Sequence, residues 1–362
     1  MTSDVHSARP HVAARLESAI DRRVASRLRR RGWTVRVEAY ASYGAPGWVR
    51  VMARALLAAP MVRKEDLPGA GGNAQVGAKQ APAVRGWRSF ATAQVSDVTL
   101  EVRVGERVHR VTTDRGGYVD VILTADLDPG WHEIAFATQD GATATAPVHV
   151  IGPDVRFGIV SDIDDTVMVT RLPRPLVAAW NVLMRHENAR EPVPGMSSLY
   201  AELLDADARL PVVYLSTGAW NAAPTIGRFL RQYHYPAGPL LLTDWGPTNS
   251  GWFRSGPTHK ITQLRRLMRE LPQVQWVLVG DDGQRDPQIY AGAAQRHPSH
   301  VLAILVRQLT FSEHLLSHGV PAPTDESLRA ELQARREGIP VIQGPDGPSL
   351  ARQIRARGLR LR

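Results

Sequence analysis

Three carboxylates follow an apolar strand near the middle of the chain. The strand FGIVS ends at Ser161, and Asp162, Asp164 and Asp165 come within the next four positions, with Thr166 behind them. Carboxylates at this spacing repel one another strongly unless a cation or a proton offsets their charge. Mg²⁺ takes carboxylate and carbonyl oxygens and would offset the charge. The segment therefore has the residue types of a magnesium-dependent acid/base or nucleophilic site.

Other polar residues end or precede neighbouring predicted elements, and these are Ser216, Thr217, Gly218, His259, Lys260, Asp281, Asp282 and Asp286. Each has an ordinary structural interpretation, because Asp caps helices, Ser-Thr-Gly forms turns and Lys is usually solvated. Together they supply two separated acidic clusters, a hydroxyl pair and a lysine. Helix capping alone does not explain that combination.

Lys260 is the most informative of these residues. Lysine occurs at only three positions of this chain, 64, 79 and 260, and every other basic residue apart from histidine is arginine. A lysine ammonium is a compact point charge, whereas the guanidinium fork is bulkier beside a metal site. This choice of residue indicates a function for Lys260.

The elements that must position these residues alternate along residues 154–310. Short apolar segments, typical of buried parallel strands, are FGIVSD, PVVYLS, PLLLTD, VQWVLVGDD and VLAILVR. Helical patterns between or beside them cover residues 175–187, 196–205, 221–234, 258–270 and 286–296. Near-continuous apolar strands with intervening helices predict a Rossmann-like parallel sheet covered on both faces. Ligands of such sheets bind beyond the carboxyl ends of the strands, where the polar residues lie.

Residues 33–153 have a different period. Apolar and polar residues alternate in TVRVEAY, GWVRVMARAL, VTLEVRV, RVHRVTT, GYVDVILTA, HEIAFAT and ATAPVHV. Short strands separated by turn residues predict an antiparallel β-sandwich of immunoglobulin-like character, interrupted by a glycine-rich loop at 68–88. No acid/base cluster occurs here, so we interpret this domain as a supporting or docking module.

Residues 1–32 contain a basic helix that begins near residue 12. Leu16, Ile20, Val24 and Leu28 recur every four residues, and six arginines lie between positions 22 and 31. The helix either lies on an anionic membrane or packs its apolar stripe on its own protein; base rates favour the second interpretation. Residues 311–362 are expected to form a basic helical extension.

Composition narrows the class of protein. The net charge is +9 and the sequence pI is about 10.3, which favours an acidic partner: nucleic acid, anionic lipid or a phosphorylated substrate. The chain has no cysteine, which excludes disulfides and thiolate chemistry. Neither a signal-peptide region nor an apolar stretch of about 20 residues is found. We expect a cytoplasmic protein, with a peripheral position at the inner face of the membrane as an open alternative.

The motifs in the second half of the chain resemble those of a known family. FGIVSDIDDT, VVYLST, HK and VLVGDDGQRD are similar, in order, to the four motifs of haloacid-dehalogenase-like phosphatases. More narrowly, SDIDDT, YLSTGAWN, HK and GDDGQRDPQIY resemble the catalytic domain of actin-patch-type phosphatidate phosphatases, which are related to lipins. The resemblance covers roughly residues 155–306.

The resemblance implies a role for each catalytic residue. Asp162 would be the nucleophile that forms an aspartyl-phosphate, and Asp164 the general acid and then the general base. Ser216 would hydrogen-bond a phosphoryl oxygen, and Lys260 would offset the negative charge of nucleophile and phosphate. The implied substrate contacts are Thr166, Thr217, Gly218 and His259. The implied Mg²⁺ ligands are Asp162, the backbone carbonyl of Asp164 and Asp281, and either Asp282 or Asp286 could contribute through water.

The function implied by the resemblance is Mg²⁺-dependent hydrolysis of phosphatidate, an anionic phospholipid. The spacing of the motifs leaves no room for a large cap, although helices around 172–205, with Trp180, Met184, Arg185, His186 and Arg190, could form a small lid. One alternative is a phosphatase for a soluble phosphomonoester. Another is a membrane-docking module with a vestigial phosphatase domain. Nucleic-acid binding rests on net charge alone and is the least favoured, and the oligomeric state stays open.

Overall fold

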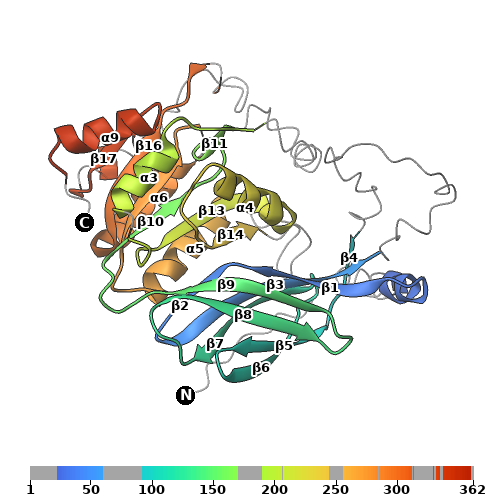
Figure 1. Ribbon diagram of the computed structural model, residues 1–362. Coiled ribbons are helices and arrows are strands. Elements are labelled where there is room, and N and C mark those ends of the chain that lie inside the picture. The colour runs from blue at the N-terminus through green and yellow to red at the C-terminus, as the bar shows by residue number, and fades with distance from the viewer. Residues whose placement is uncertain are drawn as a thin grey trace, which may run out of the picture. The chain divides into compact units, whose positions relative to one another are not determined.

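The computed structural model describes residues 23–59, 92–169, 190–205, 207–243, 256–283, 285–311, 313, 329, 332–334 and 337–359 (Figure 1). Several predicted features lie outside the described residues: most of the N-terminal helix, the glycine-rich loop at 68–88, the helix at 175–187, and Trp180, Met184, Arg185 and His186 of the expected lid.

The chain divides into two compact units that do not follow the predicted boundary at 153. The first unit is made of Met1–Ala39, Val51–Val121 and Glu133–Ala146, and the second of Tyr40–Arg50, Ile122–His132 and Pro147–Arg362. Three short segments of the β-rich half therefore belong to the unit that contains the parallel sheet. Each unit is described by itself below.

A six-stranded parallel sheet forms the centre of the second unit. Its strands are β10 (Phe157–Ser161), β13 (Val212–Ala219), β14 (Leu240–Thr243), β15 (Gln275–Asp281), β16 (Val301–Arg307) and β17 (Val341–Gly344). The order is β14-β13-β10-β15-β16-β17, and every neighbouring pair is parallel. The prediction of a parallel sheet from five of these strands is confirmed, and the buried, continuously apolar strand β10 lies near its middle.

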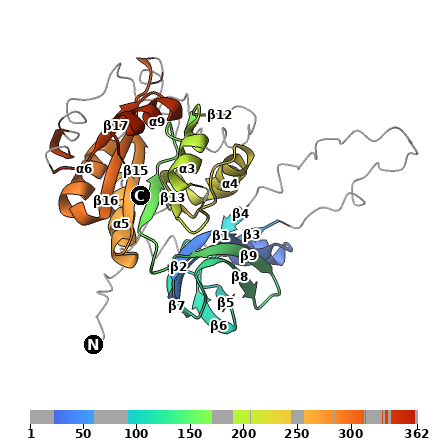
Figure 2. The same cartoon turned by 60° about the vertical axis from the view of Figure 1, so that its left-hand side comes forward.

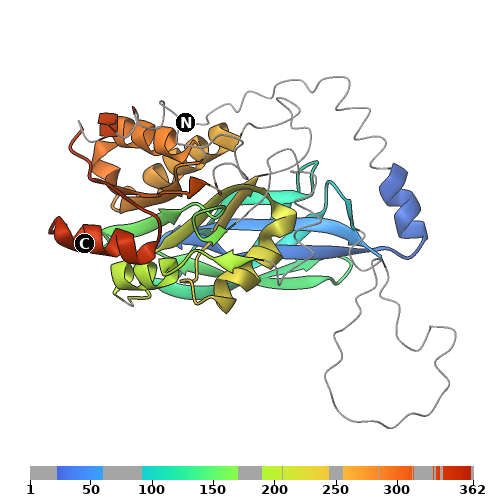
Figure 3. The same cartoon turned by 90° about the horizontal axis from the view of Figure 1, so that it is seen from above.

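Helices cover both faces of this sheet. They are α3 (Met196–Leu204), α4 (Ala223–Gln232), α5 (Gly256–Glu270), α6 (Asp286–Arg296) and α9 (Gly347–Ala356), with 3₁₀ turns η5 (Trp220–Ala222) and η6 (Pro298–His300). Helices α5 and α6 contact each other, and so do α3 and α9. The views in Figures 2 and 3 separate α5 and α6 from α3, α4 and α9, with the strands between the two groups. Buried strands need cover on both faces, and these helices supply it.

The C-terminal extension is not purely helical, which corrects the prediction for residues 311–362. Strand β17 has the sequence VIQG and adds to the sheet edge beside β16, with Ile304 opposite Val341. Helix α9 follows it, as the pattern SLARQIRARG predicts. A four-residue strand carries too little periodicity to be recognised from sequence, and only its pairing with β16 defines it.

The β-rich part of the chain forms a nine-stranded sheet. The strands are β1 (Thr34–Tyr40), β2 (Ser42–Ala45), β3 (Gly47–Ala58), β4 (Thr92–Gln94), β5 (Thr99–Val104), β6 (Arg107–Thr112), β7 (Tyr118–Ala125), β8 (Gly130–Thr138) and β9 (Thr143–Val150). The order is β1-β3-β2-β9-β8-β5-β6, and β4 and β7 also pair with β3. The pair β2–β9 is parallel, which corrects the expectation of a wholly antiparallel arrangement. The immunoglobulin-like sandwich stays a prediction.

The described part of the N-terminal helix packs on its own unit. Residues 23–30 are helical, and Ala25 and Leu28 contact a buried cluster that includes Val35, Ala55 and Leu57. Val24, predicted to lie on the apolar stripe, is 46% exposed. Ala25 and Leu28 are thus covered by the protein itself, which supports the second interpretation for these two residues and not for Val24. Among the residues described, no helix has the length and apolar character of a membrane span.

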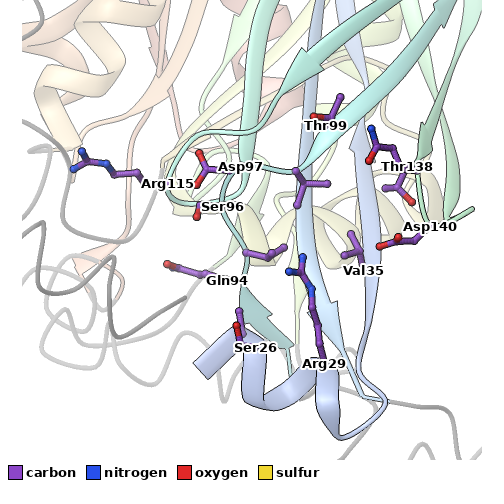
Figure 4. A pocket seen from close by; sticks show the side chains of 14 residues that line it. Ser26, Arg29, Val35, Gln94, Ser96, Asp97, Thr99, Arg115, Thr138 and Asp140 are labelled. Atoms are coloured by element: carbon purple, nitrogen blue, oxygen red, sulfur yellow. The ribbon is translucent and has the colours of Figure 1, made fainter. Parts of the chain in front are cut away.

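A cavity of the first unit opens beside this helix (Figure 4). Its lining includes Arg29, Asp97, Arg115 and Asp140, so charges of both signs face it. Because the charges are mixed, the cavity has no preference for an anion or a cation. The residues predicted to be catalytic lie in the second unit.

Candidate active site

The carboxyl ends of β10, β13 and β15 bring the predicted residues together. Strand β10 lies between the other two, and its last residue, Ser161, is opposite Tyr214 of β13 and Val279 of β15. Residues directly after Ser161, after Leu215 and after Gly280 therefore meet at one edge of the sheet. This is the edge that the sequence predicted.

Asp162 is buried and held by two donors. Lys260 Nζ donates to its Oδ1 at 2.6 Å, and Thr166 Oγ1 donates to its Oδ2 at 3.3 Å. Burial raises the pKa of the Asp162 carboxyl, and the charges of Asp286 and Asp164 raise it further, against the lowering effect of Lys260. Asp162 is thus an oriented carboxylate whose negative charge depends on a neighbouring cation.

Lys260 supplies that cation from the first half of helix α5. Its Nζ lies 2.6 Å from Asp162 Oδ1 and 2.6 Å from Asp286 Oδ1, and the side chain is buried. Burial lowers the pKa of Lys260, but the two carboxylates more than offset that effect and the net pKa is raised. The ammonium therefore stays charged between two acidic groups that come from separate elements.

Asp164 is linked to the loop that follows β13. Ser216 Oγ donates to Asp164 Oδ2 at 3.0 Å and accepts from the Gly218 amide at 2.9 Å. The other oxygen, Oδ1, is buried and has no hydrogen-bond partner among the described residues. Burial raises the pKa of Asp164 to about 6, aided by Asp165 and opposed by the Ser216 hydrogen bond. A carboxyl with this pKa can both give and take a proton near neutral pH.

Three carboxylates form a compact cluster at this edge. One oxygen each of Asp162, Asp281 and Asp286 lies within 4.8 Å of the others. Both oxygens of Asp281 and Oδ2 of Asp286 are buried without a hydrogen-bond partner among the described residues. Burial, with Asp286 and Asp162 nearby, raises the pKa of Asp281 well above its ordinary value. Buried, unsatisfied carboxylate oxygens are the donor set that a hard cation such as Mg²⁺ takes, so these residues fit the implied metal.

Gly280 leaves room for the side chain of Asp286 to approach the other two carboxylates. A Cβ atom built on Gly280 would lie 2.5 Å from Asp286 Oδ2 and 2.7 Å from the ring of Tyr290. Because any larger residue would displace Asp286, the glycine before Asp281 is part of the site's construction.

Asp282 lies outside the three-carboxylate cluster, whereas Asp286 belongs to it. Their roles as Mg²⁺ ligands stay predictions. Asp282 Oδ1 accepts a hydrogen bond from the Leu309 amide at 2.9 Å. Successive residues at a strand end point to opposite sides, so Asp281 faces the cluster and Asp282 faces the segment after β16. Asp286, in the first turn of α6, returns a carboxylate to the cluster. The resemblance left Asp282 and Asp286 as alternative contributors through water.

A side chain at the end of strand β14 holds the loop Ser216–Gly218, which was predicted to bind phosphate. Thr243 Oγ1 lies 2.7 Å from the carbonyl oxygen of Thr217 and 3.1 Å from that of Gly218. Strand β13 also changes register between Leu215 and Ala219, which bends the backbone at this point. Thr243 was not among the predicted site residues, although a hydroxyl residue at the end of the neighbouring strand was the available signal.

His259 and Arg190 are both buried in the second unit. His259 is buried, and its Nε2 lies 3.3 Å from the carbonyl oxygen of Leu241 in strand β14. Its role in substrate binding stays a prediction. Arg190, assigned to the lid, is buried beside the short strand β12 (Glu191–Pro192), with Nη1 3.2 Å from Met168 Sδ in the region of β11 (Met168–Val169). Burial lowers the pKa of Arg190, and the charge of Asp164 opposes that effect.

Comparisons with known proteins agree with the resemblance. Residues 157–308 match the family model described as phosphatidate phosphatase APP1, catalytic domain. The chain is 26% identical over 234 residues to phosphatidate phosphatase APP1 of Saccharomyces cerevisiae, covering 62% of this chain and 39% of that protein. It is 28% identical over 155 residues to an uncharacterized protein of Schizosaccharomyces pombe, covering 42% of this chain and 25% of that protein. The chain thus spans about two fifths and one quarter of the length of these curated relatives.

Similarity to solved structures is weak. A chain of the Pnkp1/Rnl/Hen1 complex is 16% identical, with a TM-score of 0.25 over 43% of this chain and 47% of that chain. A similarity at this level supports no conclusion about function.

Proposed function

We propose, from the premise that residues 157–308 belong to the catalytic-domain family of phosphatidate phosphatase APP1, that this chain hydrolyses phosphatidate to diacylglycerol and inorganic phosphate. The observation that carries the proposal is the buried Asp162, paired with Lys260 and adjacent to unsatisfied carboxylate oxygens of Asp281 and Asp286. This set of groups supports the proposal because it contains the carboxylates and the lysine of the motifs that resemble haloacid-dehalogenase-like phosphatases.

In the first half of the reaction, a carboxylate oxygen of Asp162 attacks phosphorus while the bond from phosphorus to the glycerol oxygen breaks. Asp164 donates its proton to that leaving oxygen, and its pKa of about 6 supports this role because a fraction is protonated near neutral pH. The product is an aspartyl-phosphate on Asp162. Lys260 offsets the negative charge that gathers on nucleophile and phosphoryl group.

In the second half, Asp164 takes a proton from a water molecule whose oxygen attacks the phosphorus of the aspartyl-phosphate. The bond between phosphorus and the Asp162 oxygen breaks, which regenerates the carboxylate and releases inorganic phosphate. Ser216 Oγ donates its single proton to Asp164 Oδ2 and accepts from the Gly218 amide, so it would orient Asp164. To donate to a phosphoryl oxygen, the hydroxyl would have to turn its proton away from Asp164. Phosphoryl transfer depends mainly on such positioning and charge neutralisation.

The metal site would be made by Asp162, Asp281 and Asp286, with the Asp164 backbone carbonyl as a further oxygen donor. Mg²⁺ bound there would neutralise part of the phosphate charge and hold it against the nucleophile. The unsatisfied oxygens of Asp281 and Asp286 support this proposal, because buried carboxylates without partners destabilise the fold unless something binds them.

The same residues argue against the alternative of a vestigial domain. A site without function does not need three buried carboxyl groups and the partly buried Asp164 beside one lysine, because replacing them with neutral residues would stabilise the fold. The soluble phosphomonoester is the alternative that keeps all of the chemistry. The lipid substrate is supported by the family and by the name of the yeast relative.

Location and partners follow from that substrate. We propose a cytoplasmic protein that meets an anionic phospholipid surface by peripheral contact. In the helical residues 23–30, Ala25 and Leu28 pack against the helix's own unit and are not available to insert into a membrane. The arginines of this segment would therefore bind the lipid surface by charge. Such contact weakens as salt concentration rises.

Phosphate release tests the proposal. Purified protein would be assayed on dioctanoyl phosphatidate in mixed micelles and on p-nitrophenyl phosphate in solution, with Mg²⁺ and with EDTA, alongside Asp162→Asn. Mg²⁺-dependent release from the lipid that disappears in Asp162→Asn is the expected result. Release from the soluble ester alone would keep the mechanism and overturn the lipid substrate. No release from either would overturn the enzymatic proposal for these substrates, and liposome sedimentation would then test the docking module.

A further inference from the structure

Asp165, in the catalytic loop, has a backbone conformation that few side chains adopt. Its φ is +58°, in the left-handed region, although it is not a glycine. Asp is tolerated there better than most residues but is still disfavoured relative to ordinary conformations. Because Asp165 directly follows Asp164, its conformation decides where the backbone on either side of it points.

Both peptide groups of Asp165 are held by hydrogen bonds. Its amide donates to the carbonyl oxygen of Met168 at 2.7 Å, and its own carbonyl oxygen accepts from Arg307 Nη1 at 2.8 Å. In a planar trans peptide the carbonyl of Asp164 must point away from the N–H of Asp165. The contact with Met168 thus directs the Asp164 carbonyl, and the contact with Arg307 fixes the next peptide.

Arg307 is rigidly placed for this contact. It is the last residue of β16 and is buried, with Nε 3.2 Å from the Pro345 carbonyl oxygen and Nη2 2.6 Å from Glu313 Oε1. The planar guanidinium makes three contacts in three directions, which a lysine ammonium on a flexible stem would not reproduce with the same geometry. Its charge is balanced by Glu313, so the bond to Asp165 is not needed to neutralise the arginine.

We propose that Arg307 is a positioning residue: it fixes the peptide after Asp165 and, together with the Met168 contact on the peptide before it, holds Asp165 in the left-handed conformation that aims the Asp164 carbonyl and side chain at the catalytic site. The positioning of the loop stands on these contacts alone. Its effect on Mg²⁺ binding and turnover rests on the proposed function. Partners that orient metal ligands are typically worth about 10- to 100-fold in metal affinity or activity, which sets the size of the expected effect.

The test compares Arg307→Met and Arg307→Lys with a matched control, Arg357→Met. Arg357 Nη1 also donates to a backbone carbonyl, that of Val341, at 2.8 Å, but it lies after α9 and makes no contact with the catalytic loop that the structure records among its described residues. Hydrogen exchange of a peptide spanning residues 163–168, Mg²⁺ calorimetry and steady-state kinetics would be measured on each folded variant.

For Arg307→Met we expect amide exchange in 163–168 to become at least about tenfold faster. Mg²⁺ affinity and kcat should each fall about tenfold, with little change in substrate KM. Arg307→Lys should be intermediate, and Arg357→Met should match the parent protein in all three measurements. If Arg307→Met does not fold, the same comparison is made with Arg307→Lys.

Unchanged exchange in 163–168, or equal effects of the Arg307 and Arg357 substitutions, would overturn the proposal. Failure of the parent protein to release phosphate from any substrate would overturn the proposed function instead, because the exchange measurement needs neither metal nor substrate. The two failures are therefore distinguishable.

Discussion

Lys260 and Asp162 form an ion pair that is almost wholly removed from solvent. The two atoms, Nζ and Oδ1, are 2.6 Å apart, and the side chains are 2% and 1% exposed. Asp286 shares the same ammonium, Asp281 stands nearby, and the charges of Lys260 and Arg190 both act on Asp164. The four carboxyl groups thus outnumber these two cations, and this imbalance determines how the site responds to mutation, pH and metal.

Replacing Lys260 should destabilise the protein strongly. Lys260→Met leaves the buried carboxylates of Asp162 and Asp286 without a cation, and breaking a buried pair in this way costs about 3–5 kcal/mol. Denaturant unfolding in EDTA would measure the loss, and added Mg²⁺ should restore part of it. Lys79→Met provides the composition-matched control. A Lys260→Met variant as stable as the parent would contradict the importance of the pair.

Asp281→Asn should have the opposite effect on the metal-free protein. Burial and two neighbouring carboxylates disfavour the charge of Asp281, so its removal should stabilise the fold in EDTA by about 1 kcal/mol. The same variant should lose the rise in melting temperature that Mg²⁺ gives the parent. Asp126→Asn, at an exposed position of the β-rich part, should change neither value. Retained stabilisation by Mg²⁺ in Asp281→Asn would argue against Asp281 as a ligand.

The stability of the metal-free protein should depend on the ionisation of Asp164. Burial raises its folded pKa to about 6, above its value in the unfolded chain, so the folded state binds the proton more tightly. The resulting stabilisation is fully present below the unfolded pKa and is lost as pH rises through about 6. Melting temperatures in EDTA from pH 5 to pH 8 would therefore fall less steeply for Asp164→Asn than for the parent. Identical slopes would show that Asp164 does not titrate in this window.

The meeting of Asp162, Ser216, Lys260 and Asp281 could be predicted because it follows from topology. Carboxyl ends of parallel strands share one sheet edge, so residues that end apolar strands must come together there. This prediction needed only the ends of the strands and the position of the helix that carries Lys260. The same reasoning predicted the sheet itself.

Other features depend on contacts that periodicity does not record. The turn after β15 decides that Asp286 and not Asp282 faces the cluster, and this choice depends on the Leu309 amide from the segment after β16. Strand β17 exists through its pairing with β16. Val24 and Ala25 are adjacent in sequence, yet only Ala25 is buried, because the sheet beneath the helix sets its rotation.

The choice between Asp282 and Asp286 gives a final, matched pair of substitutions. Asp286→Asn removes a carboxylate from the cluster and from Lys260, so Mg²⁺ affinity should fall at least about tenfold. Asp282→Asn keeps an oxygen that can accept from the Leu309 amide, so Mg²⁺ affinity should stay within about twofold and stability should fall by no more than about 1 kcal/mol. Calorimetric Mg²⁺ titration and denaturant unfolding measure the two effects separately. The reverse pattern, with weak binding in Asp282→Asn and parental binding in Asp286→Asn, would restore Asp282 as the ligand. It would also require the turn after β15 to rearrange around the metal, since the Asp282 carboxylate now points toward the segment after β16.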